Sequence, residues 1–133
     1  MKAALAATRQ EFESSSSRTP EYLAWHRLFK REFTKFLSSK GMTGIEIGNP
    51  NHFDLSGFFK DGAKDQIWYF RIEDIRWSKQ SMLIRTAQHY KDFTGGPNQY
   101  IPLDALDDAF EYAFDCIIER HNSTCPHCGG PNH

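Results

Sequence analysis

The chain has 133 residues, the size of one domain, because domains most often contain about 100–150 residues. Its hydrophobic fraction of 39%, with 11 phenylalanines, is enough for one compact core. The formal net charge of -1 gives the whole chain no bias towards nucleic acid or membranes, so any such affinity must come from a local patch. No apolar run approaches the roughly 18 residues of a membrane span, so we expect a soluble protein.

Residues 1–18 begin with helix-forming residues and end in the polar run Glu13–Arg18, a composition typical of a flexible segment. The apolar run Ala3–Ala7 near its start is shorter than the core of a signal peptide, which needs about 7–15 residues. We therefore expect a flexible N-terminal segment and no signal peptide.

A long amphipathic helix is predicted from Pro20 to about Ser39. Thr19 can accept hydrogen bonds from the first N–H groups of this helix, and Pro20 suits its first position. Gly41 can adopt the left-handed conformation that often follows a helix end. Large apolar residues recur at spacings of three and four, so one side of the helix should face a core. They are Tyr22, Trp25, Leu28, Phe29, Phe33, Phe36 and Leu37.

The other side of this helix is basic and forms the one basic patch of the chain. It carries Arg27, Lys30, Arg31, Lys35 and Lys40, with Glu32 as the only acid among them. One interpretation is an ordinary solvated helix face, and the other is a surface that contacts phosphates. The candidate binding residues on this face are Arg27, Lys30, Arg31 and Lys35.

Four segments have the pattern of β-strands. They are Met42–Gly48, Asn51–Phe59, Gln66–Glu73 and Ser81–Thr86. In the third, Trp68, Phe70 and Ile72 share one face. The Asp61-Gly62 pair between the second and third segments is typical of a hairpin turn.

A last helix is predicted from Pro102 or Asp104 to about His121, after an ordered surface loop that ends near Tyr100. Its core stripe contains Leu103, Leu106, Phe110, Ala113, Phe114, Ile117 and Ile118. Its outer side is acidic, with Asp104, Asp107, Asp108, Glu111, Asp115 and Glu119, and should attract the basic helix where the two meet. The elements predict a single two-layer α+β domain over residues 19–121, in the order α-β-β-β-β-α, with an antiparallel sheet flanked by two helices.

The polar face of the second strand carries His52, Asp54 and Ser56. A hydrolytic triad is disfavoured, because alternate residues of one strand stand side by side, about 7 Å apart, and do not form a relay. Asp54 and Glu73, with Glu46 as a further candidate ligand and His52 nearby, could hold a divalent metal for phosphodiester cleavage. Nucleases of that kind usually carry a lysine two residues after the second acid, where this chain has Ile75. The alternative is that Arg71 and Arg85 pair with Asp54 and Glu73.

The segment from Arg85 to Asn98 contains Gly95-Gly96, and its Arg85, His89 and Lys91 could bind an anion. It is not a P-loop, because the order Gly-x4-Gly-Lys is absent. Together with His52–Phe59, this segment resembles small uncharacterised proteins carried by bacteriophages and plasmids. The resemblance covers about residues 50–100, and it implies a mobile-element origin without implying an activity or a site.

The tail of residues 122–133 contains Cys125 and Cys128, at the spacing of a zinc knuckle. His121 and either His133 or His127 could complete a tetrahedral site. An unliganded tail, a redox pair and a metal shared between molecules remain alternatives. Cys116, among apolar helix positions, is predicted to be a buried small residue. The odd count of 3 Cys disfavours a secreted disulfide framework and favours a cytoplasmic protein.

These patterns lead to two hypotheses about function. The first is a small bacterial or phage accessory protein that binds nucleic acid or a host protein, with a structural zinc in the tail. The order of elements invites comparison with double-stranded RNA-binding modules, although a shared fold does not establish a function. The second is a metal-dependent phosphodiester hydrolase that uses the sheet carboxylates.

Overall fold

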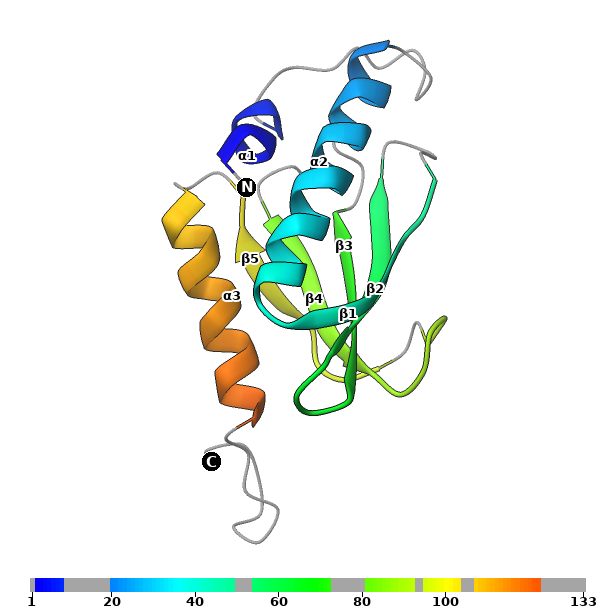
Figure 1. The fold of residues 1–133 in the computed structure, drawn as a ribbon, viewed down its shortest axis with the longest axis vertical. Coiled ribbons are helices and arrows are strands. Elements are labelled where there is room, and N and C mark those ends of the chain that lie inside the picture. The colour runs from blue at the N-terminus through cyan, green and yellow to red at the C-terminus, as the bar shows by residue number, and fades with distance from the viewer. Residues whose placement is uncertain are drawn as a thin grey trace, which may run out of the picture.

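The computed structural model describes residues 2–8, 20–49, 54–72, 81–92, 95–103 and 107–122. Within these residues the chain forms helices on one face of an antiparallel sheet (Figure 1). The elements are α1 (Lys2–Thr8), α2 (Pro20–Ser39), β1 (Met42–Ile47), β2 (Leu55–Asp61), β3 (Gln66–Ile72), β4 (Ser81–Ala87), β5 (Gln99–Pro102) and α3 (Asp107–Asn122). The predicted α+β class is confirmed, and no helix in the described part of the chain is long and apolar enough to cross a membrane.

Helix α2 has the bounds that its sequence predicts. Its last turn is closed by hydrogen bonds from Lys40 N to Leu37 O, at 3.0 Å, and from Gly41 N to Ser38 O, at 3.1 Å. Gly41 has a φ of 81°, which glycine adopts without the steric cost that a Cβ would add. The chain can therefore reverse directly into β1.

The sheet is an antiparallel meander in the order β1-β2-β3-β4-β5. The turn between β2 and β3 lies where the Asp61-Gly62 pair predicts it, and Asp65 N donates to Asp61 O at 2.7 Å. Strand β5 lies where the sequence predicts the end of a surface loop. It pairs with β4 through Ile101 opposite Met82, and four residues are too few to show a period. Pro102 suits this strand because an edge position needs no N–H donor there.

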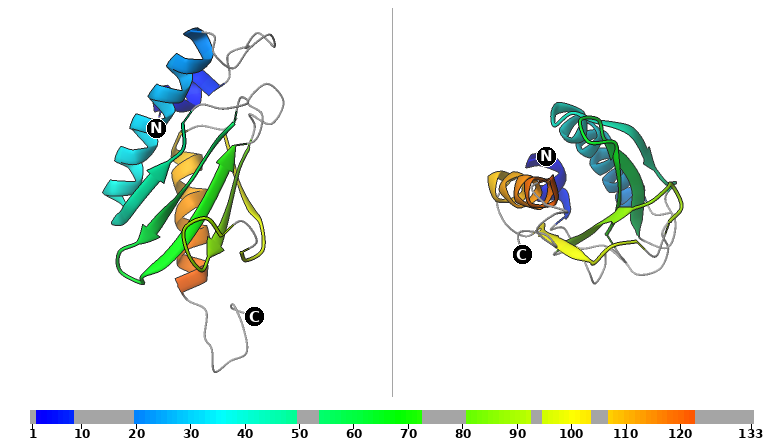
Figure 2. Two further views of the ribbon diagram at one scale, coloured as in Figure 1. Left: turned by 90° about the vertical axis from the view of Figure 1, so that its right-hand side faces the viewer. Right: turned by 90° about the horizontal axis from the view of Figure 1, so that it is seen from below.

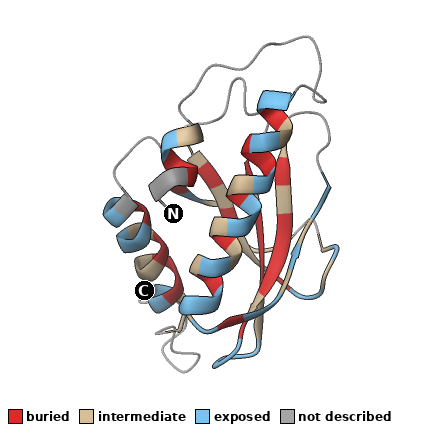
Figure 3. Cartoon of the chain, turned by 45° about the horizontal axis from the view of Figure 1, so that its top comes forward, coloured by how far each residue is buried: buried red, intermediate tan, exposed pale blue. Residues whose placement is uncertain are grey.

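The core lies between the sheet and the helices, which Figure 2 shows on the concave side of the curved sheet. The ring centroid of Phe33, on α2, lies 4.9 Å from that of Phe70 on β3 and 6.2 Å from that of Phe110 on α3. All three side chains are fully buried. Figure 3 shows buried residues along the inner side of each element. This contact joins the three main elements in one core.

At the two ends of the described chain the structure adds to what the sequence predicts. Residues 1–18 begin with helix-forming residues, and Lys2–Thr8 form a helix that contacts α2 and whose Ala4 and Leu5 are buried. The polar run Glu13–Arg18 lies outside the described residues. Helix α3 is described from Asp107, and the predicted start at Asp104 lies outside the described residues. Pro102 does not open the helix, because it is the last residue of β5 and pairs with Ser81 of β4. Leu103 is buried as expected, but before the helix starts.

Candidate functional site

The basic face of α2 is an exposed stripe along the outside of the helical layer. Arg27, Lys30, Arg31 and Lys35 are all exposed, and with Thr34 they line a shallow hollow of about 570 Å³. They recur at the three- and four-residue spacing of one helix face and extend over about 12 Å, at about 1.5 Å per residue. We call these four residues the basic stripe.

The charges of the basic stripe are not neutralised by acids in the described part of the chain, where none of the four residues forms an ion pair. Glu32, the acid on this side of the helix, accepts a hydrogen bond from Ala4 N at 2.9 Å and so holds α1 in place. Like charges four residues apart in a helix cost about 0.2–0.5 kcal/mol per pair. The stripe is therefore an unfavourable arrangement for the free protein.

Lys40, the fifth basic residue predicted for this surface, serves a different purpose. Its Nζ binds Glu111 and lies 3.0 Å from Oδ2 of Asp115, so it joins α2 to α3. Burial lowers the pKa of Lys40, but the hydrogen bonds to the two carboxylates outweigh that effect and raise it above 10.5. The predicted attraction between the helices is confirmed at this residue.

His26 lies on the buried side of α2, and the sequence reading missed it. It is 2% exposed, and its ring makes edge contacts with Tyr22 and Trp25. Burial, helped by the charge of Lys30, lowers the pKa of His26 from 6.5 to about 4. Its Nε2 has no hydrogen-bond partner among the described residues, so the folded protein holds a neutral imidazole here.

The proposed phosphodiesterase residues do not form a described metal site. Asp54 binds Arg71, with Oδ2 3.3 Å from Nη2, as the alternative interpretation predicts. His52 and Glu73 lie outside the described residues. Arg85 lies over the ring of Tyr69, 4.6 Å from its centroid, and donates to Oδ1 of Asn98 at 3.1 Å. Asp54, Arg71 and Arg85 are thus each held by a neighbouring side chain.

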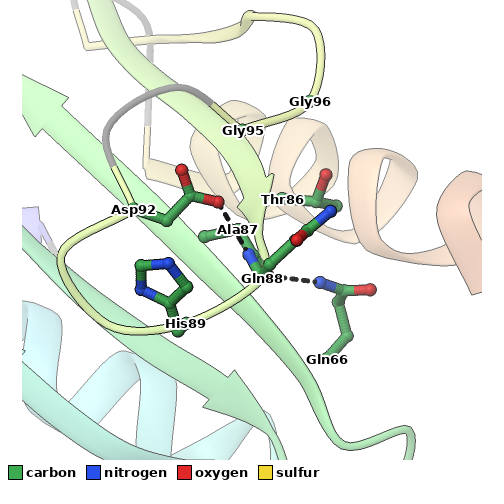
Figure 4. Close-up of a pocket in the computed structure, with 8 residues that line it drawn as sticks. All are labelled: Gln66, Thr86, Ala87, Gln88, His89, Asp92, Gly95 and Gly96. Atoms are coloured by element: carbon green, nitrogen blue, oxygen red, sulfur yellow. Dashed lines mark hydrogen bonds between the residues drawn. The ribbon is translucent and has the colours of Figure 1, made fainter.

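The loop after β4 does not gather Arg85, His89 and Lys91 into one site. Of these three predicted residues, only His89 lines the pocket that the loop forms, and Asp92 lies beside it (Figure 4). Sequence reading missed Asp92, because a single acid in a loop carries no periodic signal. It also missed Gln66, which comes from the neighbouring strand β3.

Most of the predicted zinc site, Cys125, Cys128 and His133, lies outside the described residues, as does His127. The described residues contain no group of three or more potential metal ligands. His121 is described, and its Nε2 lies 3.2 Å from Oε1 of Gln66. Cys116 is half-buried rather than buried, and it forms a hydrogen bond with the exposed Tyr112.

The tautomer of His121 follows from its contacts. The amide nitrogen of Gln66 donates to Ile67 O at 2.8 Å and to Ala87 O at 3.0 Å, which fixes the orientation of the amide. The atom facing His121 is therefore an oxygen, and only a protonated Nε2 can bind it. In the neutral ring, Nδ1 then carries the lone pair.

Comparison with known proteins assigns no family to this chain. No family model, no curated protein and no solved structure matches it. What the protein does must therefore be inferred from its side chains and their surroundings.

Proposed function

We propose that the protein is a small bacterial or phage accessory protein of the cytoplasm that binds the phosphate backbone of nucleic acid. The observation that supports this proposal is the basic stripe: four exposed cations on one helix face, without ion-pair partners in the described part of the chain. Phosphates would relieve the repulsion within the stripe and release the counterions that surround nucleic acid.

A duplex suits this surface better than a single strand. Proteins that bind single strands usually stack bases on exposed aromatic rings, and the aromatic residues of α2 lie on its buried or half-buried side. The large hydrophobic residues that are exposed in the described chain, Tyr100 and Tyr112, belong to β5 and α3. Lysine and arginine contacts to phosphates position a protein without reading bases, so we expect little sequence preference.

The neighbouring helix limits how much of a duplex the protein can touch. Asp108, Glu111 and Glu119 are exposed on α3, and they would repel phosphates that approach across both helices. The contact should therefore be confined to α2. Such a small contact predicts weak binding that depends strongly on salt.

We also propose that zinc closes the tail through Cys125, Cys128, His121 and His133. The support is the fixed tautomer of His121, because a metal-binding histidine commonly donates its other N–H to an oxygen, as Nε2 does to Gln66. Metal analysis of the purified protein tests this directly. Zinc at one equivalent should disappear in a Cys125→Ser, Cys128→Ser variant, and a metal-free wild type would end the idea.

The binding proposal is tested with a labelled duplex whose fluorescence anisotropy is followed between 50 and 200 mM salt. Four phosphate contacts predict that log K falls with log salt at a slope of about -3.6, and Arg27→Ala, Arg31→Ala, Lys35→Ala should reduce the slope to about -1. The matched control is Lys64→Ala, Lys91→Ala, Arg120→Ala, which removes three exposed cations elsewhere. It should keep most of the slope.

Equal losses in the two triple variants, or unchanged affinity in the α2 variant, would contradict the proposal. A protein partner is the alternative. It would be indicated if the α2 variant lost a protein that copurifies with the wild type after nuclease treatment.

A further inference from the structure

A second site lies away from α2, at the end of β4. The pocket has a volume of about 630 Å³, within the range of small-molecule sites. It is lined by Gln66, Thr86, Ala87, Gln88, His89, Asp92, Gly95 and Gly96 (Figure 4). All of these except Ala87 offer either a polar side chain or, at the two glycines, backbone groups that no side chain covers. The pocket therefore suits a polar ligand.

The walls of this pocket are held by hydrogen bonds. Gln66 ties β3 to the end of β4 through Ala87 O, at 3.0 Å, and Gly96 N donates to Thr86 O at 3.0 Å. A Cβ on Gly95 would lie 2.0 Å from Thr86 O, so only glycine allows the returning chain to approach the strand this closely. The pocket therefore has its shape before any ligand binds, which reduces the entropy lost on binding.

Two side chains place hydrogen-bond acceptors at the pocket. Nδ1 of His89 lies 2.8 Å from Tyr90 O, and a carbonyl only accepts, so Nδ1 carries the proton and Nε2 of the neutral ring is an acceptor. The carboxylate of Asp92 is oriented by Gln88 N, which donates to Oδ2 at 2.9 Å. Both groups are thus positioned by backbone contacts within the loop.

The turn that presents these two groups has an unusual backbone. Asp92 N donates to His89 O at 3.1 Å, and Lys91, the third residue of the turn, has a φ of 74°. Glycine or asparagine usually occupies that position, because a side chain there is strained. Strained residues are concentrated at binding and catalytic sites, which is consistent with a turn kept for its geometry.

We infer that this pocket binds a small organic cation with N–H donors, such as an amine or a guanidine. The described lining contains the carboxylate of Asp92 and no lysine or arginine. The sequence suggested an anion site here, but Arg85 lies over Tyr69 and binds Asn98. The site is independent of the basic stripe, whose residues do not line it.

The test is an NMR titration of the full-length protein with agmatine, which carries an amine and a guanidine, while the backbone amides of the pocket are followed. Tetramethylammonium, a cation without N–H donors, and inorganic phosphate are titrated in parallel. We expect saturable shifts at Gln88, His89, Gly95 and Gly96 with agmatine and none with the other two. If the shifts do not approach saturation by about 10 mM agmatine, the complex is weaker than a millimolar one, and this result would overturn the inference.

Two conservative variants separate ligand binding from loop folding. Asp92→Asn keeps an oxygen that can accept from Gln88 N but removes the charge, and His89→Asn keeps a donor near Tyr90 O but removes Nε2. Asp92→Asn should lower the affinity for agmatine at least about tenfold, which is the loss expected for one charge-assisted hydrogen bond. Asp108→Asn, the same change on exposed α3, should leave the affinity unchanged.

Other outcomes would overturn the assignment. If tetramethylammonium binds as tightly as agmatine, the N–H donors are irrelevant. If phosphate shifts the same amides, the loop is an anion site after all. If Asp92→Asn and Asp108→Asn weaken binding equally, agmatine is attracted by the net charge of the protein and not held in the pocket.

Discussion

Helices α2 and α3 pack on the same sheet with similar inner sides, but they present opposite charges to solvent. Phe29 and Phe33 of α2 and Phe110 and Phe114 of α3 are buried in one core. The outer side of α2 carries the basic stripe, whereas that of α3 carries Asp108, Glu111 and Glu119. Where the helices meet, Lys40 alone provides the described ion pairs between them. The fold thus uses the inner sides of the two helices and the cation Lys40. The positive charges of the basic stripe remain available for a partner.

The largest effect should come from the core that the two helices share. Phe33→Ala removes the ring that contacts Phe70 and Phe110, and a buried Phe→Ala change costs about 3–5 kcal/mol. Urea unfolding followed by tryptophan fluorescence measures this loss. Phe36→Ala, at a half-buried position of the same helix, should cost clearly less. Equal costs would mean that the inner side of α2 is not the determinant of stability.

The second effect is a dependence of stability on pH, and it comes from His26 on the buried side of α2. Because the pKa of His26 is about 4 in the folded protein and about 6.5 in the unfolded chain, the unfolded state binds the extra proton between these values. Stability should therefore be retained above pH 6.5 and fall by up to about 3 kcal/mol as the pH drops to 4.

Urea unfolding at pH 7 and pH 4.5 checks the pH effect. His26→Phe should remove most of the additional loss at low pH, since it leaves no imidazole to protonate. His89→Asn, at an exposed histidine, should keep it. An unchanged pH dependence in His26→Phe would assign the acid sensitivity to other groups.

The third effect concerns the contact between the helices. Lys40→Met removes the bonds to Glu111 and Asp115 but keeps much of the apolar stem, so we expect a loss of about 1 kcal/mol in unfolding free energy. Because the pKa of Lys40 is raised, this contribution should persist at neutral pH and disappear only above 10.5. Lys35→Met, in the basic stripe, should cost nothing or stabilise slightly. The opposite order would show that the stripe is part of the fold.

The smallest effect concerns the acidic side of α3. Asp108→Asn with Glu119→Gln should raise duplex affinity by about twofold at 50 mM salt, because repulsion by charges near the stripe is reduced. At 200 mM salt the gain should largely vanish. Anisotropy titrations measure both values. A loss of affinity would indicate that α3 contributes contacts of its own.

Much of the fold could be predicted because it depends on local spacing. The bounds of α2 follow from Pro20, Gly41 and the aromatic stripe between them, and the inner face of β3 follows from the alternation of Trp68, Phe70 and Ile72. The short elements escaped prediction, since β5 has four residues and α1 has seven. Neither is long enough to show a period, and each is defined by the element on which it packs.

The candidate sites divide in the same way. Sequence alone determined that Arg27, Lys30, Arg31 and Lys35 share one face, because helical geometry places residues three and four apart on the same side. Only the tertiary structure decided that Glu32 faces α1, that Lys40 bridges to α3, and that His26 is buried. It also decided that His89 and Asp92, rather than Arg85, line the pocket after β4. These facts depend on contacts between segments far apart in the chain, and such contacts leave no periodic signal in either segment.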